Sequence, residues 1–287
     1  IGMTTESICM SNLRIAPIQV SGYGHPVSGF GTEVDYFIGG ADVEDVSLAA
    51  QNYDERLVLI PGIGAAPVHP TYKRTDNYRP NDPLIANCAW PPQKINYAWL
   101  SVLRQAADRG ERKVIYRIFA GTSLEDTGGL QAFMRDLTEV LGADSVQVAR
   151  KVARDVYMGE IEKGDFSLDA YPYGGYNTVI DSLHVARPFV TWEGTEFCNR
   201  SAAALLRKVG LKELIASSRN EYVAKIVRMI DDTAYRDELS QRITEMDLDA
   251  LLFQSGENVY FKKAIDYLIA NHDRLTAEGA RDPIFIT

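Results

Sequence analysis

The sequence is poor in the features that would place a protein in several large classes. Its three cysteines, Cys9, Cys88 and Cys198, are scattered and lack the spacing of a zinc site or of a disulfide framework. We therefore expect reduced thiols and a cytoplasmic protein. No apolar run reaches about 18 residues, so no membrane-spanning helix is expected. The N-terminal residues lack the apolar segment of a signal peptide.

Basic residues are also in short supply. The chain has 30 Lys and Arg against 39 Asp and Glu, which gives a net charge of -9. A nucleic-acid-binding protein needs a basic surface, so nucleic acid is not an expected partner. The hydrophobic content of 46% and charged content of 24% are those of an ordinary globular protein. The chain does not begin with Met, and from this we expect a fragment of a longer protein.

Familiar catalytic and metal motifs are missing as well. The sequence has no Walker motif, no His-x-x-x-His pair and no Gly-x-Ser-x-Gly elbow. Gly62-x-Gly64 lacks the third glycine of a dinucleotide fingerprint, and Asp247-Leu-Asp249 lies between late helices, where helix capping is expected. No metal site is predicted.

What the chain does have is a regular alternation of strands and helices that begins at residue 84. This pattern predicts βαβ units and a parallel sheet. Before it, residues 1–60 predict strands with little helix, and residues 62–83 form a linker rich in Pro, Gly and polar residues. The expected strands are 14–20, 34–39, 56–60, 84–90, 113–120, 145–148, 167–170 and 189–192, and the expected helices are 43–53, 96–109, 130–141, 152–163, 177–185, 221–232, 235–244 and 259–270.

The most informative stretch is 169–200, where a strand runs through a turn with Gly174 and Gly175 into a helix. The free N–H groups of such a helix start bind anions, and glycines let a phosphate approach the backbone. Asn177 and Thr178 add hydrogen-bonding side chains there. Asp181 lies one turn further on the same face, where a carboxylate suits the hydroxyls of a ribose. The alternative is an ordinary capped helix in an α/β sheet.

Two residues outside this stretch have the right chemistry to join it. Lys94 follows the strand 84–90 and could neutralise a diphosphate at the glycine turn. The alternative for Lys94 is a solvated lysine at a helix start. His25 lies in a Gly-rich loop, where it could touch a phosphate or transfer a proton.

Two segments, 16–40 and 168–211, resemble the catalytic region of glycosyltransferase family 41. This family contains the eukaryotic protein O-GlcNAc transferases and the bacterial cytoplasmic N-glycosyltransferases that modify adhesins. The run Gly-Tyr-Gly-His-Pro at 22–26 and the run Asp-Tyr-Phe-Ile-Gly-Gly at 35–40 are closer to the bacterial branch.

The resemblance implies a GT-B architecture, in which two Rossmann-like domains hold a UDP-sugar between them. The C-terminal Rossmann-like domain is expected to be complete and the N-terminal one partial. The expected boundaries are 1–83 for the partial N-terminal domain and linker, 84–255 for the UDP-binding domain, and 256–287 for a C-terminal helix and tail that could cross back to the N-terminal part.

The resemblance also assigns roles within the site. Lys94, with Asn177 and Thr178, is expected at the phosphates, and Asp181 at the ribose. Gly24 and His25 match the loop that approaches the phosphates and sugar from the N-terminal domain. The O-GlcNAc branch has a lysine and a histidine near the uracil where this chain has Arg154 and Tyr157, which can serve by charge and stacking. Tyr176 is a further candidate for stacking on the uracil or sugar, with aromatic packing as the alternative. His25 and Lys94 are the expected catalytic residues, and no general base is named.

The expected activity is an inverting, metal-independent transfer of a hexose from a UDP-sugar to a protein side chain, with Asn as the first candidate acceptor. The expected donor is a UDP-hexose, with UDP-glucose ahead of the others, and the acceptor a protein such as an adhesin; no cofactor is expected. By the resemblance, we expect most of the N-terminal Rossmann-like domain, which in the family carries the acceptor site, to be missing from this chain. A non-catalytic UDP-binding or scaffold module is therefore the alternative, and a GT-B enzyme with a small-molecule acceptor is a third hypothesis.

Overall fold

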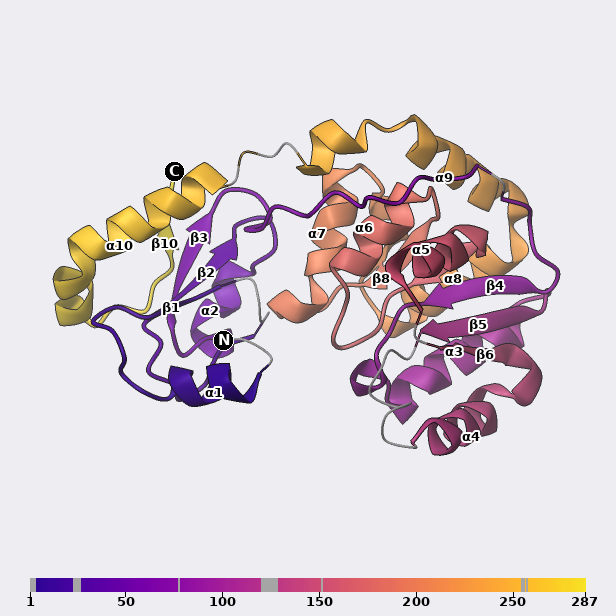
Figure 1. Ribbon diagram of the computed structural model, residues 1–287, viewed down its shortest axis with the longest axis horizontal. Coiled ribbons are helices and arrows are strands. Elements are labelled where there is room, and N and C mark those ends of the chain that lie inside the picture. The colour runs from indigo at the N-terminus through magenta and orange to yellow at the C-terminus, as the bar shows by residue number, and fades with distance from the viewer. Residues whose placement is uncertain are drawn as a thin grey trace.

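The computed structural model describes residues 4–22, 27–76, 78–119, 129–150, 152–253, 256 and 258–287. Within that part of the chain, two parallel sheets form the centres of two lobes that lie side by side (Figure 1). The strand orders are β1-β2-β3-β10 in the first lobe and β6-β5-β4-β7-β8-β9 in the second. The GT-B architecture expected from the sequence is confirmed.

The first lobe is built from both ends of the chain. The C-terminal segment returns to it, and Ile284 of its last strand pairs with Val58. Because side chains alternate along a strand, the sheet packs on both faces. One face contacts the long C-terminal helix through Leu268, and the other packs Phe37 on Tyr53. The described elements of this lobe are α1 Thr5–Ser11, β1 Val20–Ser21, β2 Tyr36–Gly40, η1 Val46–Leu48, α2 Ala49–Asn52, β3 Arg56–Ile60, α10 Asn258–Glu278 and β10 Ile284–Phe285.

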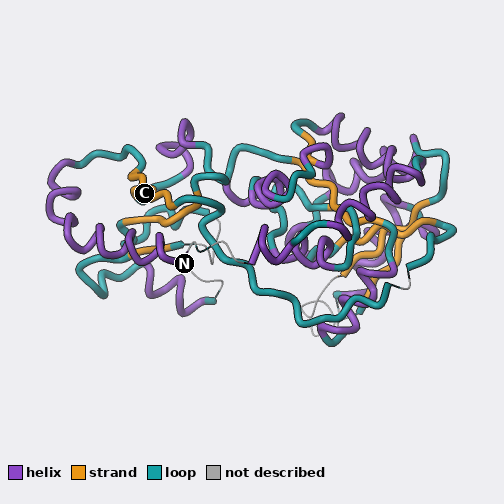
Figure 2. Tube along the Cα trace, turned by 90° about the horizontal axis from the view of Figure 1, so that it is seen from above, coloured by secondary structure: helices purple, strands orange, loops and turns teal. Residues whose placement is uncertain are grey.

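The second lobe contains the larger core. Helices cover its six-stranded sheet, as the alternating pattern from residue 84 predicted (Figures 1 and 2). Every strand pair in it is parallel. Its described elements are β4 Leu84–Cys88, η2 Pro92–Lys94, α3 Tyr97–Arg109, β5 Val114–Phe119, α4 Leu130–Leu141, η3 Ala143–Ser145, β6 Val146–Ala149, α5 Arg154–Lys163, β7 Phe166–Leu168, α6 Asn177–His184, β8 Phe189–Trp192, η4 Phe197–Asn199, α7 Ser201–Lys208, η5 Lys212–Leu214, β9 Ile215–Ala216, α8 Arg219–Asp231, α9 Thr233–Glu245 and η6 Asp249–Phe253.

Two predictions for the first lobe were wrong. Of the strand expected at 14–20, only Val20 is in a strand. Pro17 has no N–H to give to a ladder, and the side chain of Gln19 accepts from the N–H of Ile15 and donates to the carbonyl of Glu33. The helix expected at 43–53 is reduced to a 3₁₀ turn and one turn of α-helix, because Asp45 caps the chain at Ser47 and starts the helical segment late.

The linker between the lobes lies along the second lobe as an extended loop (Figures 1 and 2). Tyr72 and Thr75 donate hydroxyl hydrogen bonds to the carboxylate of Glu162, and Tyr78 donates one to Asp165 at 2.7 Å. The linker is therefore part of the second lobe's surface over this length.

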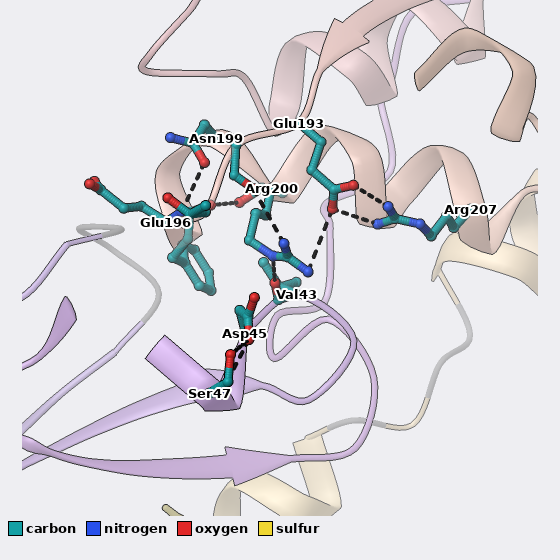
Figure 3. A network of polar contacts seen from close by, with 12 residues as sticks. Val43, Asp45, Ser47, Glu193, Glu196, Asn199, Arg200 and Arg207 are labelled. Carbon is teal, nitrogen blue, oxygen red and sulfur yellow. Dashed lines mark hydrogen bonds and ion pairs between the residues drawn. The ribbon is translucent and has the colours of Figure 1, made fainter. Parts of the chain in front are cut away.

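Arg200 joins the two lobes directly. It begins α7 in the second lobe, and its guanidinium donates to the backbone carbonyl of Val43 in the first (Figure 3). The same guanidinium lies 3.6 Å from the carboxylate of Glu193, which is also paired with Arg207. Val43 itself packs into the core of the second lobe. In the described residues, no helix is long and apolar enough to span a membrane.

Glu44 makes the stability of this junction depend on pH. Its side chain is only 7% exposed, and burial raises its pKa to about 7, although Tyr53 donates a hydrogen bond to it. The unfolded-state pKa of Glu is about 4.3, so the folded protein binds this proton more tightly. The stability contributed by Glu44 is therefore present below about pH 4 and is lost as the pH rises through about 7. Between pH 5 and pH 8, the free energy of unfolding by urea should fall less in Glu44→Gln than in the unchanged protein. An equal fall in both proteins would contradict this assignment.

Candidate functional site

The candidate site lies at the carboxyl ends of β4 and β7, which are neighbours in the second sheet. Lys94 follows β4, and the glycine turn that leads into α6 follows β7. Ligands of open α/β sheets bind at this edge, and the candidates from the sequence lie there.

Lys94 reaches the glycine turn. Its Nζ donates to the carbonyl oxygen of Gly174 at 2.6 Å and lies 4.6 Å from the ring centre of Tyr173. The side chain is partly buried, and this burial lowers the pKa of Lys94, partly offset by the charge of Asp169. The structure thus places Lys94 in the turn itself and excludes the alternative of a freely solvated lysine.

The turn needs glycine at both of its central positions. A Cβ atom on Gly175 would lie 2.0 Å from Oγ1 of Thr178, and one on Gly174 would lie 2.9 Å from Oδ2 of Asp169. The backbone of the turn therefore approaches its neighbours more closely than any side chain allows. The N–H groups of both glycines are used within the protein: that of Gly174 donates to the carbonyl of Cys198 and that of Gly175 to Asp169, each at 2.8 Å.

Asp169 is the residue of this region that the sequence did not single out. It lies directly after β7, is 3% exposed, and accepts hydrogen bonds from the N–H groups of Ala170 and Gly175 and from Oγ1 of Thr191. Burial raises the pKa of Asp169 to about 6, against the lowering effect of Thr191 and Lys94. The signal that could have identified it is a carboxylate at a strand end just before a glycine turn.

Helix α6 begins at Asn177, as predicted, and presents its first turn beside the glycine turn. Among the described residues no side chain caps this helix at Tyr176, whose hydroxyl instead donates to the carbonyl of Ala65 in the linker at 3.1 Å. Asn177 is exposed and Thr178 half-buried. An uncapped helix start with two polar side chains can accept an anionic group.

Asp181 lies on α6 and is paired with Arg154 from the start of α5. Both guanidinium Nη atoms of Arg154 donate to the carboxylate of Asp181, one of them at 2.9 Å. Asp181 is 2% exposed, and burial raises its pKa while Arg154 partly reverses the shift. Tyr157 lies under the same guanidinium, 5.3 Å from ring centre to Cζ. The three residues form one cluster. Arg154, with about half of its side chain exposed, lies on the solvent side of it.

The structure therefore brings the predicted residues into two groups around the first two turns of α6. The first contains Lys94 and the glycine turn, with Asn177 and Thr178. The second contains Arg154, Tyr157 and Asp181. Gly24 and His25 lie outside the described residues. In the described part of the chain, no group of three His, Cys, Asp or Glu side chains could hold a metal ion.

The fold of the described residues is of the GT-B type. Among solved structures, a variant of the O-GlcNAc transferase from Thermobaculum terrenum superposes with a TM-score of 0.71 at 21% identity, covering 89% of this chain and 48% of that one. The model of the family "Glycosyl transferase family 41" matches residues 138–262. Over these residues the chain is similar to glycosyltransferase family 41.

Curated proteins are also similar to this chain. The chain is 27% identical over 252 residues to a UDP-glucose:protein N-beta-glucosyltransferase of Actinobacillus pleuropneumoniae, with 85% of this chain and 39% of the relative covered. It is 28% identical over 244 residues to a probable UDP-N-acetylglucosamine–peptide N-acetylglucosaminyltransferase SPINDLY of Hordeum vulgare, with 81% and 25% covered. The chain thus spans about two fifths or less of the length of these relatives.

Proposed function

We propose that this chain is the donor-binding part of a protein glycosyltransferase that uses a UDP-hexose. The observation that carries the proposal is the contact of Lys94 with the Gly174–Gly175 turn beside the start of α6. A lysine beside the N–H groups of a helix start forms a site for a diphosphate. The cluster of Arg154 and Tyr157 of α5 with Asp181 of α6 is the site that we propose for the nucleoside. Tyr176, the residue before α6, is the further residue that we propose for stacking on the uracil or sugar.

Relatives support the choice of donor and acceptor. The bacterial relative is named for UDP-glucose and for transfer to protein nitrogen, and the plant relative for UDP-N-acetylglucosamine and transfer to peptide. We propose UDP-glucose as the donor and an Asn side chain of a protein, such as an adhesin, as the acceptor. The three free cysteines fit a cytoplasmic location for this reaction.

We propose an inverting mechanism without a metal ion. As the bond between the sugar and UDP breaks, negative charge builds on the β-phosphate. The Lys94 ammonium and the N-terminus of α6 are preorganised to stabilise that charge. Residues 84–255 serve as the donor-binding domain in this proposal. Residues 1–83 and 256–287 make the partial N-terminal lobe in this proposal, and Gly24 and His25 are its proposed contributors to binding of the phosphates and sugar.

Calorimetry with UDP, followed by a glycosylation assay, tests this function. The chain should bind UDP, and in a mixture with UDP-glucose and an Asn-x-Ser/Thr peptide it should add one hexose mass to the peptide. UDP binding without transfer and without hydrolysis of UDP-glucose would favour the second candidate, a UDP-binding module. Absence of UDP binding would remove both.

Asp181→Ala should weaken UDP binding by ~1–3 kcal/mol if the carboxylate bonds the ribose hydroxyls. The carboxylate is now held by Arg154, so the variant also frees that guanidinium. Asp237→Ala is a suitable control, because Asp237 is an exposed carboxylate on α9. Calorimetry at one pH gives both affinities. An unchanged affinity in Asp181→Ala would place the ribose elsewhere.

A further inference from the structure

Lys94 follows β4 and Asp169 follows β7, and the side chains of both lie against Gly174 of the glycine turn. Nζ of Lys94 donates to the carbonyl of Gly174, and Oδ2 of Asp169 lies 2.9 Å from the position of a Cβ on Gly174. We propose that Asp169 is a positioning residue of the donor site: it fixes the glycine turn and supplies the negative charge that balances the Lys94 ammonium. This inference rests on the proposed function, because it assumes that the turn and Lys94 receive the diphosphate.

The positioning part of the proposal rests on the hydrogen bonds of Asp169. One carboxylate oxygen accepts from the N–H groups of Ala170 and Gly175, at 2.9 and 2.8 Å. The other accepts from the Thr191 hydroxyl at 2.7 Å, and Thr191 lies on β8 with no exposed surface. The turn is thereby tied to the neighbouring strand through one side chain. Tyr222 of α8 donates to the backbone carbonyl of Asp169 at 2.9 Å and holds the same residue from behind.

The electrostatic part rests on the surroundings of Lys94. In the described part of the chain, Lys94 and Asp169 form no ion pair at contact distance, so their charges act on each other through the buried turn. Asp169, from the end of β7, raises the pKa of Lys94 against its burial. The other titratable groups packed around Lys94 are Tyr173 in the turn and Cys198 in η4, and Glu196 lies 3.8 Å from the Cys198 sulfur. Burial raises the pKa of Cys198 to about 12 and that of Tyr173 as well, so both are neutral near pH 7.

A purely structural carboxylate would have different consequences on substitution. Asp169→Asn keeps the size of the side chain and removes its charge. Without that charge the Lys94 ammonium loses its proton at a lower pH, and UDP binding is then lost at a lower pH than in the unchanged protein. A carboxylate that only holds the backbone would lower the affinity equally at every pH.

Calorimetric UDP titrations between pH 7 and pH 10 provide the test. Asp169→Asn should move the upper pH limit of UDP binding downward, so that its affinity falls severalfold further below that of the unchanged protein at pH 10 than at pH 7. The matched control is Asp165→Asn, because Asp165 is an equally buried carboxylate at the other end of β7 that accepts from Tyr78 and Asn81. This control should reduce stability and leave the pH dependence of binding in place. A pH limit that is the same in Asp169→Asn and in the unchanged protein would overturn the electrostatic role.

Thr191→Val tests the positioning role even if Asp169→Asn does not fold. It removes one hydrogen bond to Asp169 and keeps the charge, so the affinity for UDP should fall severalfold with no shift of its pH limit. Unchanged affinity in Thr191→Val would overturn the positioning role. If the unchanged protein does not bind UDP, the proposed function fails; if it binds and the two variants behave like it, only the role of Asp169 fails.

Discussion

Lys94→Ala is expected to weaken the binding of UDP about five- to 150-fold, which corresponds to ~1–3 kcal/mol for a charged hydrogen bond. The ammonium group already lies in the glycine turn, 2.6 Å from the carbonyl of Gly174. Its position is therefore set before a ligand arrives, and little side-chain entropy is lost on binding. Because part of the surrounding surface is open, the truncation should cost the fold much less than it costs the site.

The matched control for this variant is Lys225→Ala. Lys225 on α8 is also a partly buried lysine that donates to a backbone carbonyl, that of Glu213, at 2.8 Å. It lies outside the candidate site, so its removal should leave UDP affinity unchanged. Calorimetry of both variants, with a thermal melt of each, separates loss of binding from loss of fold. Equal UDP affinity in Lys94→Ala and the unchanged protein would place the diphosphate away from the glycine turn.

The candidate site could be predicted from the sequence because its main features are local. A glycine turn between a strand and a helix, with polar residues at Asn177 and Thr178, is readable within about ten residues. Lys94 could be added because the carboxyl ends of parallel strands share one edge of a sheet. Both inferences need only the order of strands and helices, which hydrophobic periodicity gives well in the second lobe.

Contacts between distant segments could not be predicted in the same way. From the sequence pattern, Asp169 is only the end of a strand. Its role depends on the contact with Thr191, 22 residues later in the sequence, which the pattern does not reveal. The pairing of Arg154 with Asp181 joins α5 to α6 through two residues that are 27 positions apart in the sequence. The sequence assigned these two residues to one ligand by resemblance, but it did not indicate that they contact each other.

The first lobe was predicted less well for a physical reason. Its strands are short, and the segment 14–19 is held by side-chain hydrogen bonds of Gln19 and Asp35 instead of by a ladder. Such local bonds compete with secondary structure and leave an apolar run that looks like a strand. Its sheet is also completed by residues 284–285, more than 200 positions after β3, which no local pattern reveals.

Gly40→Ala is expected to have the largest effect on stability, about 3 kcal/mol or more, because it forces backbone against backbone. A Cβ atom on Gly40 would lie 2.1 Å from the carbonyl carbon of Ile63 and 2.5 Å from the N atom of Gly64. Gly64 has a positive φ of 82°, so this segment cannot relax easily. Ile63 packs into the core of the second lobe, and a displaced Ile63 would loosen the junction between the lobes.

Gly22→Ala is the matched control, because the nearest atom to its Cβ would be the carbonyl oxygen of Ile38 at 3.6 Å, an ordinary contact. Urea unfolding should show a lower midpoint for Gly40→Ala and little change for Gly22→Ala. Near-normal stability in Gly40→Ala would mean that the chain at 62–64 can move away from the end of β2 at little cost. Val43, three residues after Gly40, is bonded to Arg200 of the second lobe, so the variant should separate the lobes before the second lobe unfolds. Tryptophan fluorescence reports on the second lobe alone, because Trp90, Trp99 and Trp192 all lie in it.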